Sequence, residues 1–243
     1  MLYHTDIVYS IEGLENLYSN LGVKLHGTVM RLIPTEYAEE LHRNEHQPFS
    51  LFCIESRAEN TVMLRMSALT DKAELICRAL SSQEYVTIYG LKKPLERVAV
   101  QHSEPLPIEA IFGAAVPKGY RVDFISPAVF RRSGKSHCSP ELSRYLRSAA
   151  EKLALFEGIE FDIEKLLEYA AAIPIDRYSL NGQRYNVSGS LYSGMIGWME
   201  LIFPDKSTEN AVLLNTVLRY AEYSGLGAKT AVGMGGISLT PIE

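Results

Sequence analysis

Cysteine is scarce in this sequence, and its few residues form no pattern. Cys53, Cys77 and Cys138 lie far apart, their number is odd, and no two of them make a CxxC pair. This arrangement excludes a zinc knuckle and a disulfide framework, and it agrees best with a reducing compartment. We therefore expect a cytoplasmic protein.

Long apolar runs and an excess of positive charge are missing as well. No run approaches the roughly 20 residues that a membrane span needs, and the first residues lack a secretory signal, so we expect no membrane partner. The 243 residues include 24 lysines and arginines against 29 aspartates and glutamates, which gives a net charge of −5. The composition thus gives no general signal for nucleic acid, and an anionic partner would need a local basic patch.

The first half of the chain alternates between strand and helix patterns. Strands are predicted at 7–11, 49–56, 61–69 and 85–89, the last of them continued after a bend by 97–102, and helices at 23–33, 35–44 and 71–80. The order strand, helix, strand, strand, helix, strand is the ferredoxin-like pattern. We therefore predict an α+β domain over residues 1–115.

Prolines and glycines cluster between residues 103 and 119 and mark the predicted boundary between two domains. Beyond them, helices are predicted at 140–156, 163–172 and 209–224, and strands at 120–126 and 195–203. The stretch 231–239 is glycine-rich but ends with a strand pattern. The β-rich stretch that follows the second of these helices has turn signals at Asn181–Gly182 and Ser188–Gly189. The second domain, residues 116–243, is thus also predicted to be α+β.

A glycine-rich segment follows the last predicted helix. Its glycines are Gly225, Gly227, Gly233, Gly235 and Gly236. A dinucleotide-binding loop or a P-loop would have to precede a helix, so both are excluded. Two interpretations stay open. The segment is either a helix C-cap followed by a glycine hairpin, or backbone that approaches a phosphodiester closely, with free N–H groups as donors and Lys229 as the cation.

The order of a helix, GLGAKTAVGMGG and then the C-terminus resembles the signature loop of the CRISPR-associated endoribonucleases. These enzymes belong to the RAMP superfamily and cut precursor CRISPR RNA within its repeats. Three further stretches are similar to that family: Leu41–His42 followed by Pro48–Phe49–Ser50, the segment FISPAVFRR at 124–132, and the apolar segment with Gly194 and Gly197 before Trp198. Over nearly the whole chain, the resemblance implies two tandem ferredoxin-like domains that bind CRISPR repeat RNA and cleave it without a metal.

Metal-independent cleavage proceeds by attack of the ribose 2′-hydroxyl on the adjacent phosphate, and it leaves a 5′-hydroxyl and a 2′,3′-cyclic phosphate. Histidine suits the proton transfers of this reaction, because its unperturbed pKa is about 6.5. In the family the catalytic histidine lies in this part of the first domain, so the resemblance makes His42 the first candidate and His46 the second. Arg43, Lys229 and Tyr37 are candidates for a second partner, with Lys229 favoured to neutralise phosphate charge.

The i, i+4 spacing of His42 and His46 would also suit zinc if both residues shared one helix. No third ligand is patterned nearby and Pro48 follows at once, so we expect neither a metal site nor any other cofactor. Without the family resemblance, a solvated imidazole at a helix end stays open as an alternative interpretation of His42.

Residues 131–147 form a local basic stripe. It contains Arg131, Arg132, Lys135, Arg144 and Arg147 against the single acidic residue Glu141. In a chain of net charge −5 this asymmetry predicts an RNA-binding surface, with 131–138 as an exposed loop. The alternative is a solvated helix face beside a basic loop.

The sequence therefore predicts an endoribonuclease that acts on CRISPR repeat RNA, as a monomer or a homodimer, with subunits of a CRISPR effector complex as further partners. Glycines 225, 227, 233 and 235 would contact the RNA backbone together with Lys229 and the basic stripe. Two alternatives stay open: a RAMP subunit that binds RNA without cutting it, and a ferredoxin-like metabolic or regulatory enzyme that binds a small anion. The second predicts weak RNA binding with little dependence on salt.

Overall fold

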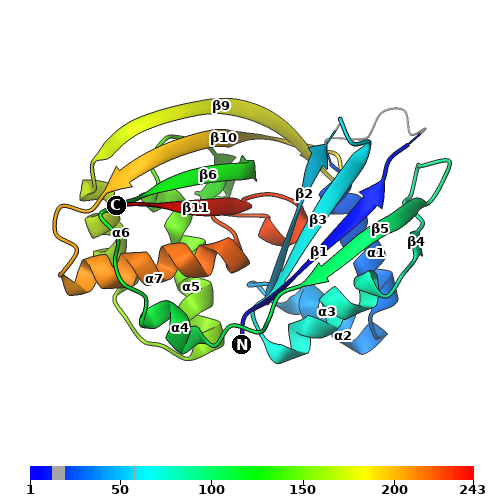
Figure 1. The fold of residues 1–243 in the computed structure, drawn as a ribbon, viewed down its shortest axis with the longest axis horizontal. Helices are drawn as coiled ribbons and strands as arrows, with labels where there is room; N and C mark the ends of the chain where they lie inside the picture. Colours follow the sequence, from blue (N-terminus) through cyan, green and yellow to red (C-terminus); the bar gives the residue numbers. More distant parts are fainter. Residues whose placement is uncertain (13–19, 57) are drawn as a thin grey trace.

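Two antiparallel β-sheets lie side by side, and helices cover one face of each (Figure 1). They are seen in a computed structural model that describes residues 1–12, 20–56 and 58–243. Within these residues the first sheet ends at residue 102 and the second begins at residue 119. The two sheets therefore follow each other along the chain.

The first sheet and its helices are built by residues 3–102. The strands are β1 (Tyr3–Ser10), β2 (Phe49–Ser56), β3 (Thr61–Ala68), β4 (Tyr85–Val86) and β5 (Leu95–His102), and the helices are α1 (Leu21–Leu32), α2 (Thr35–Arg43) and α3 (Asp71–Ser81). The strand order is β2-β3-β1-β5-β4, and all neighbours are antiparallel. With β4 as an added edge strand, this is the ferredoxin-like arrangement that the sequence predicted.

The core of the first sheet follows from the alternation of apolar side chains. In β1, residues 3, 5, 7 and 9 are buried while their neighbours are partly exposed. Because successive side chains of a strand point to opposite faces, the buried set packs against α1 and α3. Helix α3 begins where it does because the side chain of Thr70 accepts a hydrogen bond of 3.2 Å from the Ala73 N–H.

The second half of the chain repeats this arrangement. Its elements are α4 (Ile108–Phe112), β6 (Gly119–Ala128), β7 (Phe130–Arg132), β8 (Lys135–His137), α5 (Ser143–Glu157), α6 (Ile163–Ala172), β9 (Ile175–Val187), β10 (Ser190–Ile202), α7 (Glu209–Ser224), the 3-10 helix η1 (Thr230–Val232) and β11 (Ile237–Ile242). The strand order β11-β6-β10-β9 is antiparallel throughout. The predicted fold class, two tandem ferredoxin-like domains, is thus confirmed.

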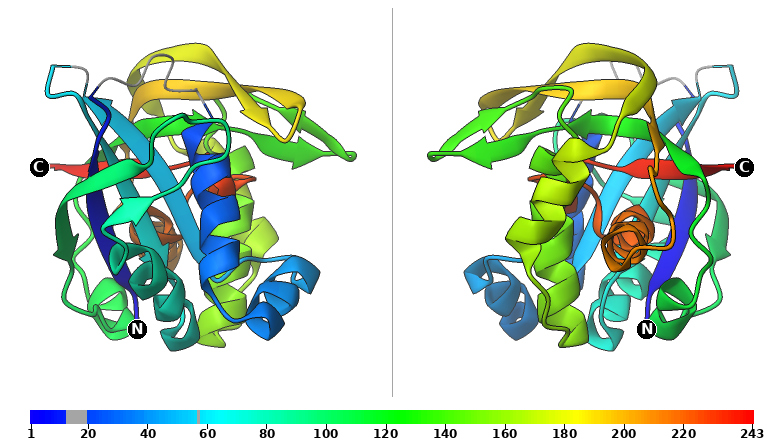
Figure 2. Two further views of the ribbon diagram at one scale, coloured as in Figure 1. Left: turned by 90° about the vertical axis from the view of Figure 1, so that its right-hand side faces the viewer. Right: turned by 90° about the vertical axis from the view of Figure 1, so that its left-hand side faces the viewer.

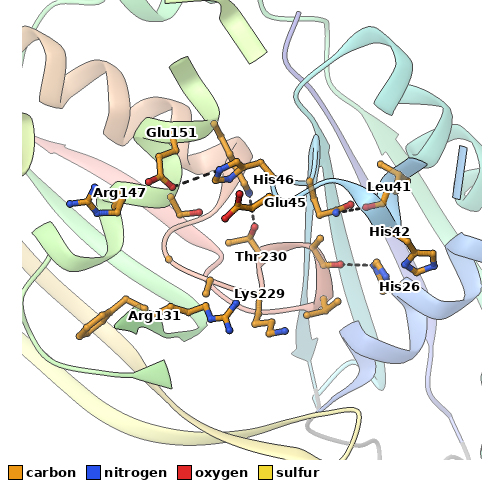
Figure 3. A pocket seen from close by; sticks show the side chains of 18 of the residues that line it. His26, Leu41, His42, Glu45, His46, Arg131, Arg147, Glu151, Lys229 and Thr230 are labelled. Atoms are coloured by element: carbon orange, nitrogen blue, oxygen red, sulfur yellow. Dashed lines mark hydrogen bonds and ion pairs between the residues drawn. The ribbon is translucent and has the colours of Figure 1, made fainter. Parts of the chain in front are cut away.

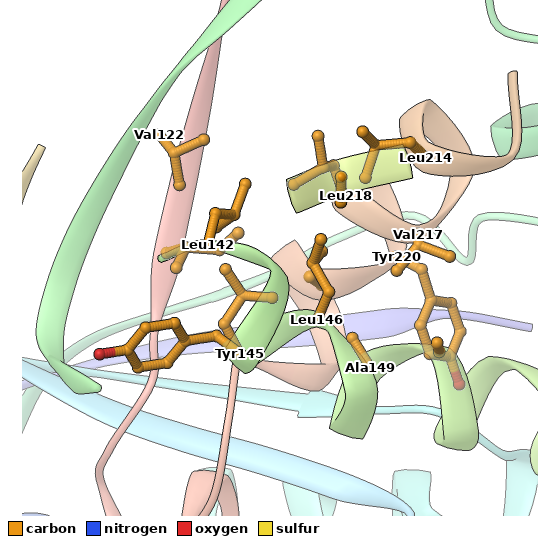
Figure 4. Packing of buried hydrophobic residues seen from close by; sticks show 14 of the residues in the cluster. Val122, Leu142, Tyr145, Leu146, Ala149, Leu214, Val217, Leu218 and Tyr220 are labelled. Carbon is orange, nitrogen blue, oxygen red and sulfur yellow. The ribbon is translucent and has the colours of Figure 1, made fainter. Parts of the chain in front are cut away.

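The core of the second half lies between its sheet and the helices α5 and α7 (Figure 4). Leu146 and Ala149 of α5, Val217 of α7 and Val122 of β6 are all fully buried. Helix α7 also lies against β2 and β3 of the first sheet, where the Ser50 hydroxyl donates to the Tyr223 carbonyl at 2.5 Å. This helix thus belongs to one core and contacts the other sheet.

The predicted turn at Asn181–Gly182 is wrong. These two residues lie inside β9, where they pair with Ile196 and Met195 of β10. The turn of this hairpin lies at the other predicted position, Ser188–Gly189, where both residues have positive φ. A favourable turn dipeptide is overridden here because the hydrogen-bonded ladder between β9 and β10 extends across it.

Two further local predictions differ from the structure. The residues predicted as one bent strand, 85–102, form two strands, because Leu95 and Glu96 fold back onto Val86 and Tyr85. The segment predicted as a loop, 131–138, is largely the β7–β8 hairpin, which projects from the body of the protein (Figure 2).

The division of the chain into two domains between residues 115 and 116 stays a prediction.

Among the described residues, no helix has both the length and the apolar character needed to span a lipid bilayer.

Candidate active site

A pocket of about 460 Å³ opens where the two halves of the chain meet (Figure 3). Its lining includes His26, His42 and His46 from the first half and Arg131, Gly227, Lys229 and Thr230 from the second. The structure therefore brings both predicted histidines together with three of the predicted RNA-binding residues. These residues are far apart in sequence and meet only through the packing of the two sheets.

His42 is presented by the last turn of α2. The helix ends at Arg43 and the next residue, Asn44, is extended. The end is fixed by the Gln47 side chain, which donates hydrogen bonds to the carbonyls of Leu41 at 2.7 Å and of Asn44 at 3.1 Å. The His42 side chain is exposed, and it lines the pocket beside His26. An imidazole in this position is open to a bound ligand.

His46 lies beyond the end of α2, so it does not share a helical face with His42. Its Nε2 atom is 3.8 Å from a carboxylate oxygen of Glu151 on α5. The helical i, i+4 geometry that would suit zinc is therefore not formed. Among the described residues, no group of three or more His, Cys, Asp and Glu side chains is arranged to hold a metal ion.

His26 of α1 is a third histidine in the pocket, and the sequence pattern did not single it out. Its Nδ1 donates to the Ala231 carbonyl at 2.9 Å, and its ring stacks on Phe49 with centres 5.9 Å apart. Burial lowers the pKa of His26, the hydrogen bond to Ala231 opposes that shift, and the charge of His42 adds to it. A neutral ring with its proton on Nδ1 leaves Nε2 as a free acceptor. Only the tertiary contact with residue 231 reveals this role, so no sequence signal could have found it.

Three of the four predicted glycines do not offer the free amides that one interpretation of the sequence required. The N–H groups of Gly225, Gly227 and Gly235 donate to the carbonyls of Ala221, Tyr145 and Pro127, at 2.9, 2.9 and 3.0 Å. Their expected role as bare donors to phosphate is therefore wrong, because the segment satisfies them within the fold. Of the four predicted glycines only Gly227 lines this pocket. Contact of the others with RNA stays a prediction.

Close packing explains why glycine is needed in this segment. Gly227 and Gly235 have φ of +80° and +72°, and a Cβ atom on either would lie 2.2 Å from the carbonyl oxygen of Val129 or of Leu226. Only a residue without a side chain fits such a position. The glycines thus fold the segment tightly and set the position of the residues between them.

Lys229 stands at the point of this segment that faces the pocket. It is exposed and has φ of +68°, a left-handed conformation that costs about 1–2 kcal/mol for a residue with a side chain. Its ammonium lies 5.9 Å from the centre of the Tyr192 ring. The role of Lys229 in binding phosphate stays a prediction.

The predicted basic stripe is only partly available to a ligand. Arg131 lines the pocket, Arg132 lines an adjoining pocket of about 440 Å³, and Lys135 lies exposed on β8 outside both. Arg144 is paired with Glu141 at 2.8 Å, and Arg147 is paired with Glu164 of α6 at 2.7 Å. The stripe is less basic than its sequence suggests, because α6 adds acidic residues to the same surface.

Comparison with known proteins finds similar sequences in one family of enzymes. Residues 122–237 match the family model of the CRISPR-associated endoribonuclease Cas6. The Cas6 of Streptococcus thermophilus is 25% identical over 237 residues, which cover 96% of this chain and 97% of that protein. The chain is a relative of the CRISPR-associated endoribonucleases. A second such enzyme, the Cas6 of Mycobacterium tuberculosis, is 25% identical over 92% of this chain and 73% of its own length.

A solved Cas6 structure supports the same relationship at the level of the fold. A Cas6 product complex superposes with a TM-score of 0.80, with 24% identity over 99% of this chain and 100% of that one. The family resemblance predicted from the terminal loop and the three shorter motifs is thus confirmed, and so is the fold that it implied.

Proposed function

We propose that this protein is an endoribonuclease that cleaves CRISPR repeat RNA in the pocket between its two sheets. The observation that carries the proposal is the pocket itself, in which histidines of the first half face Lys229 and Arg131 of the second. Proton-transfer groups on one side and cations on the other suit a phosphodiester held between them. The relationship to the CRISPR-associated endoribonucleases supports the substrate class.

The reaction is transfer of the phosphodiester to the ribose 2′-oxygen. The 2′-hydroxyl loses its proton to a base and attacks phosphorus, while the 5′-oxygen of the next nucleotide leaves and takes up a proton from an acid. The products are a 2′,3′-cyclic phosphate and a 5′-hydroxyl. Every proton that moves can be carried by imidazoles, so the reaction needs no metal.

His42 is the residue that we assign to one of these proton transfers. It is exposed at the edge of the pocket, whereas His46 is held against Glu151 and His26 against the Ala231 carbonyl. The neutral ring of His26 presents Nε2 as an acceptor beside His42, so we assign it the partner role. Lys229 would neutralise the charge of the bound phosphate.

The test is cleavage of a synthetic repeat RNA in EDTA by the wild-type chain and by His42→Ala, His46→Ala and His26→Ala. We expect cleavage by the wild type, a loss of at least about a hundredfold for His42→Ala, and a smaller loss for His46→Ala. Products are identified by their end groups. Cleavage that requires a divalent metal, or products with a 5′-phosphate, would contradict the mechanism.

A RAMP subunit that binds RNA without cutting it is the remaining alternative. It predicts that the intact protein retains the RNA in a mobility-shift assay and produces no fragments. The same gel therefore separates the two functions.

A further inference from the structure

A buried lysine forms part of the wall of the pocket. Lys152 of α5 is only 3% exposed, and its ammonium donates to the Ser224 carbonyl at 2.9 Å and to the Thr230 hydroxyl at 2.7 Å. Ser224 is the last residue of α7 and Thr230 is the first residue of η1. Lys152 therefore bridges the two ends of the short segment 225–229, which carries Lys229.

Burial of an amine is costly for the fold. Desolvation lowers the pKa of Lys152 from 10.5 to about 7. A methionine, which is nearly as long, would fill most of the same space without that cost. The lysine is therefore better explained by what its ammonium holds than by packing.

Thr230 connects this lysine to the pocket. Its side chain is buried against the segment, since a Cβ atom added to Gly225 would lie 2.7 Å from the Thr230 methyl group. The same residue lines the pocket next to Lys229 (Figure 3). The front of the segment thus faces the pocket while its back is fixed by Lys152.

We propose that Lys152 is a positioning residue for RNA binding, which holds Ser224 and Thr230 and so fixes Lys229 at the place of the scissile phosphate. The inference rests on the proposed function. Lys152 does not touch the RNA; it acts through the segment that it bridges. In its charged form it also adds a positive charge behind the bound phosphate.

Other ionisable groups surround the same space. Those that share the pocket with Lys152 are His26 of α1, His42 of α2, Glu45 and His46 of the following loop, Arg131 of β7, Arg144, Arg147 and Glu151 of α5, and Lys229. From α7, the Tyr220 hydroxyl donates to the Lys152 carbonyl at 3.5 Å. A pH profile of the wild type alone would mix these groups, so the test compares two proteins at each pH.

The test measures kcat and KM for cleavage of repeat RNA by Lys152→Met, Thr230→Val and Thr230→Ser. Thr230→Val removes the hydroxyl and keeps the shape of the side chain. We expect its KM to rise about tenfold, because a hydrogen bond to a charged group is lost. Its kcat should change by less than threefold. Thr230→Ser keeps the hydroxyl, and its KM should be at least fivefold below that of Thr230→Val. Equal KM values for the two Thr230 variants would overturn the proposal, even if Lys152→Met fails to fold.

The second measurement is the ratio of KM between Lys152→Met and the wild type. We expect the ratio to fall at least threefold from pH 6 to pH 8.5, because the wild type loses the Lys152 ammonium in that range while the other ionisable groups of the pocket are the same in both proteins. A constant ratio would contradict the proposal. If the wild type itself neither binds nor cuts the RNA, the proposed function fails instead, so the two failures are distinct.

Discussion

The Nε2 atom of His46 lies 3.8 Å from Oε2 of Glu151, and this contact joins the loop after α2 to helix α5 across the pocket. The two side chains are 24% and 35% exposed. The pair therefore links the two halves of the chain at the proposed site of cleavage. It also distinguishes the two candidate histidines, because Glu151 is paired with His46 and lies on the opposite wall from His42.

Replacement of Glu151 by glutamine tests which histidine does the chemistry. If His42 transfers the proton, kcat changes by less than about fivefold, since a half-exposed pair contributes at most about 1 kcal/mol. The measurement is single-turnover cleavage of repeat RNA. A loss of a hundredfold or more would assign the chemistry to His46 held by Glu151.

Gly227→Ala should damage both the fold and the activity. The added Cβ would lie 2.2 Å from the Val129 carbonyl oxygen at a φ of +80°, so we expect a loss of about 2 kcal/mol or more in the free energy of unfolding. Gly189→Ala is the matched control, because Gly189 has φ of +89° but nothing near its added Cβ. Urea denaturation of both variants makes the comparison. Equal losses of unfolding free energy in the two variants would show that glycine is needed at position 227 for its backbone conformation and not for the close packing.

The buried amine of Lys152 gives the fold a pH dependence of known sign. The pKa is lowered from 10.5 to about 7, so unfolding takes up a proton between these values and the folded state gains stability as the pH rises through that range. The gain is at most about 1.4 kcal/mol per pH unit. Denaturation at pH 6.5, 7.5 and 9 should show a steeper rise for the wild type than for Lys152→Met. Parallel curves would mean that the amine titrates near its ordinary value.

Arg131 should contribute to RNA affinity through phosphate contacts. Removal of one such contact lowers the log–log slope of affinity against salt by about 0.7 for single-stranded RNA. Arg131→Ala is compared with Arg78→Ala, an exposed arginine of α3 that is paired with Glu74 outside the pocket. An unchanged slope for Arg131→Ala would remove this residue from the RNA path.

The sequence predicted the order of strands and helices well because local patterns determine it. The helices at 163–172 and 209–224 have the predicted bounds, since each has an apolar face and an N-terminal cap. The turn at Asn181–Gly182 was wrong because pairing with β10 outweighs a local turn preference.

The candidate site was predicted only in part, and the reason is again physical. His42 and Lys229 were found through the family resemblance. His26 and Lys152 were missed because their roles depend on contacts with residues 205 and 78 positions away. The amides of Gly225, Gly227 and Gly235 are not free, and the sequence could not show this because it does not reveal which carbonyls lie close to them.

The assignment of His42 is tested most directly by the rate of repeat-RNA cleavage in EDTA by His42→Ala relative to the wild type. We expect the wild type to leave 2′,3′-cyclic phosphate ends, and the variant to bind the RNA normally but to cut it at least about a hundredfold more slowly. Cleavage by the variant at the wild-type rate would show that His42 is not catalytic.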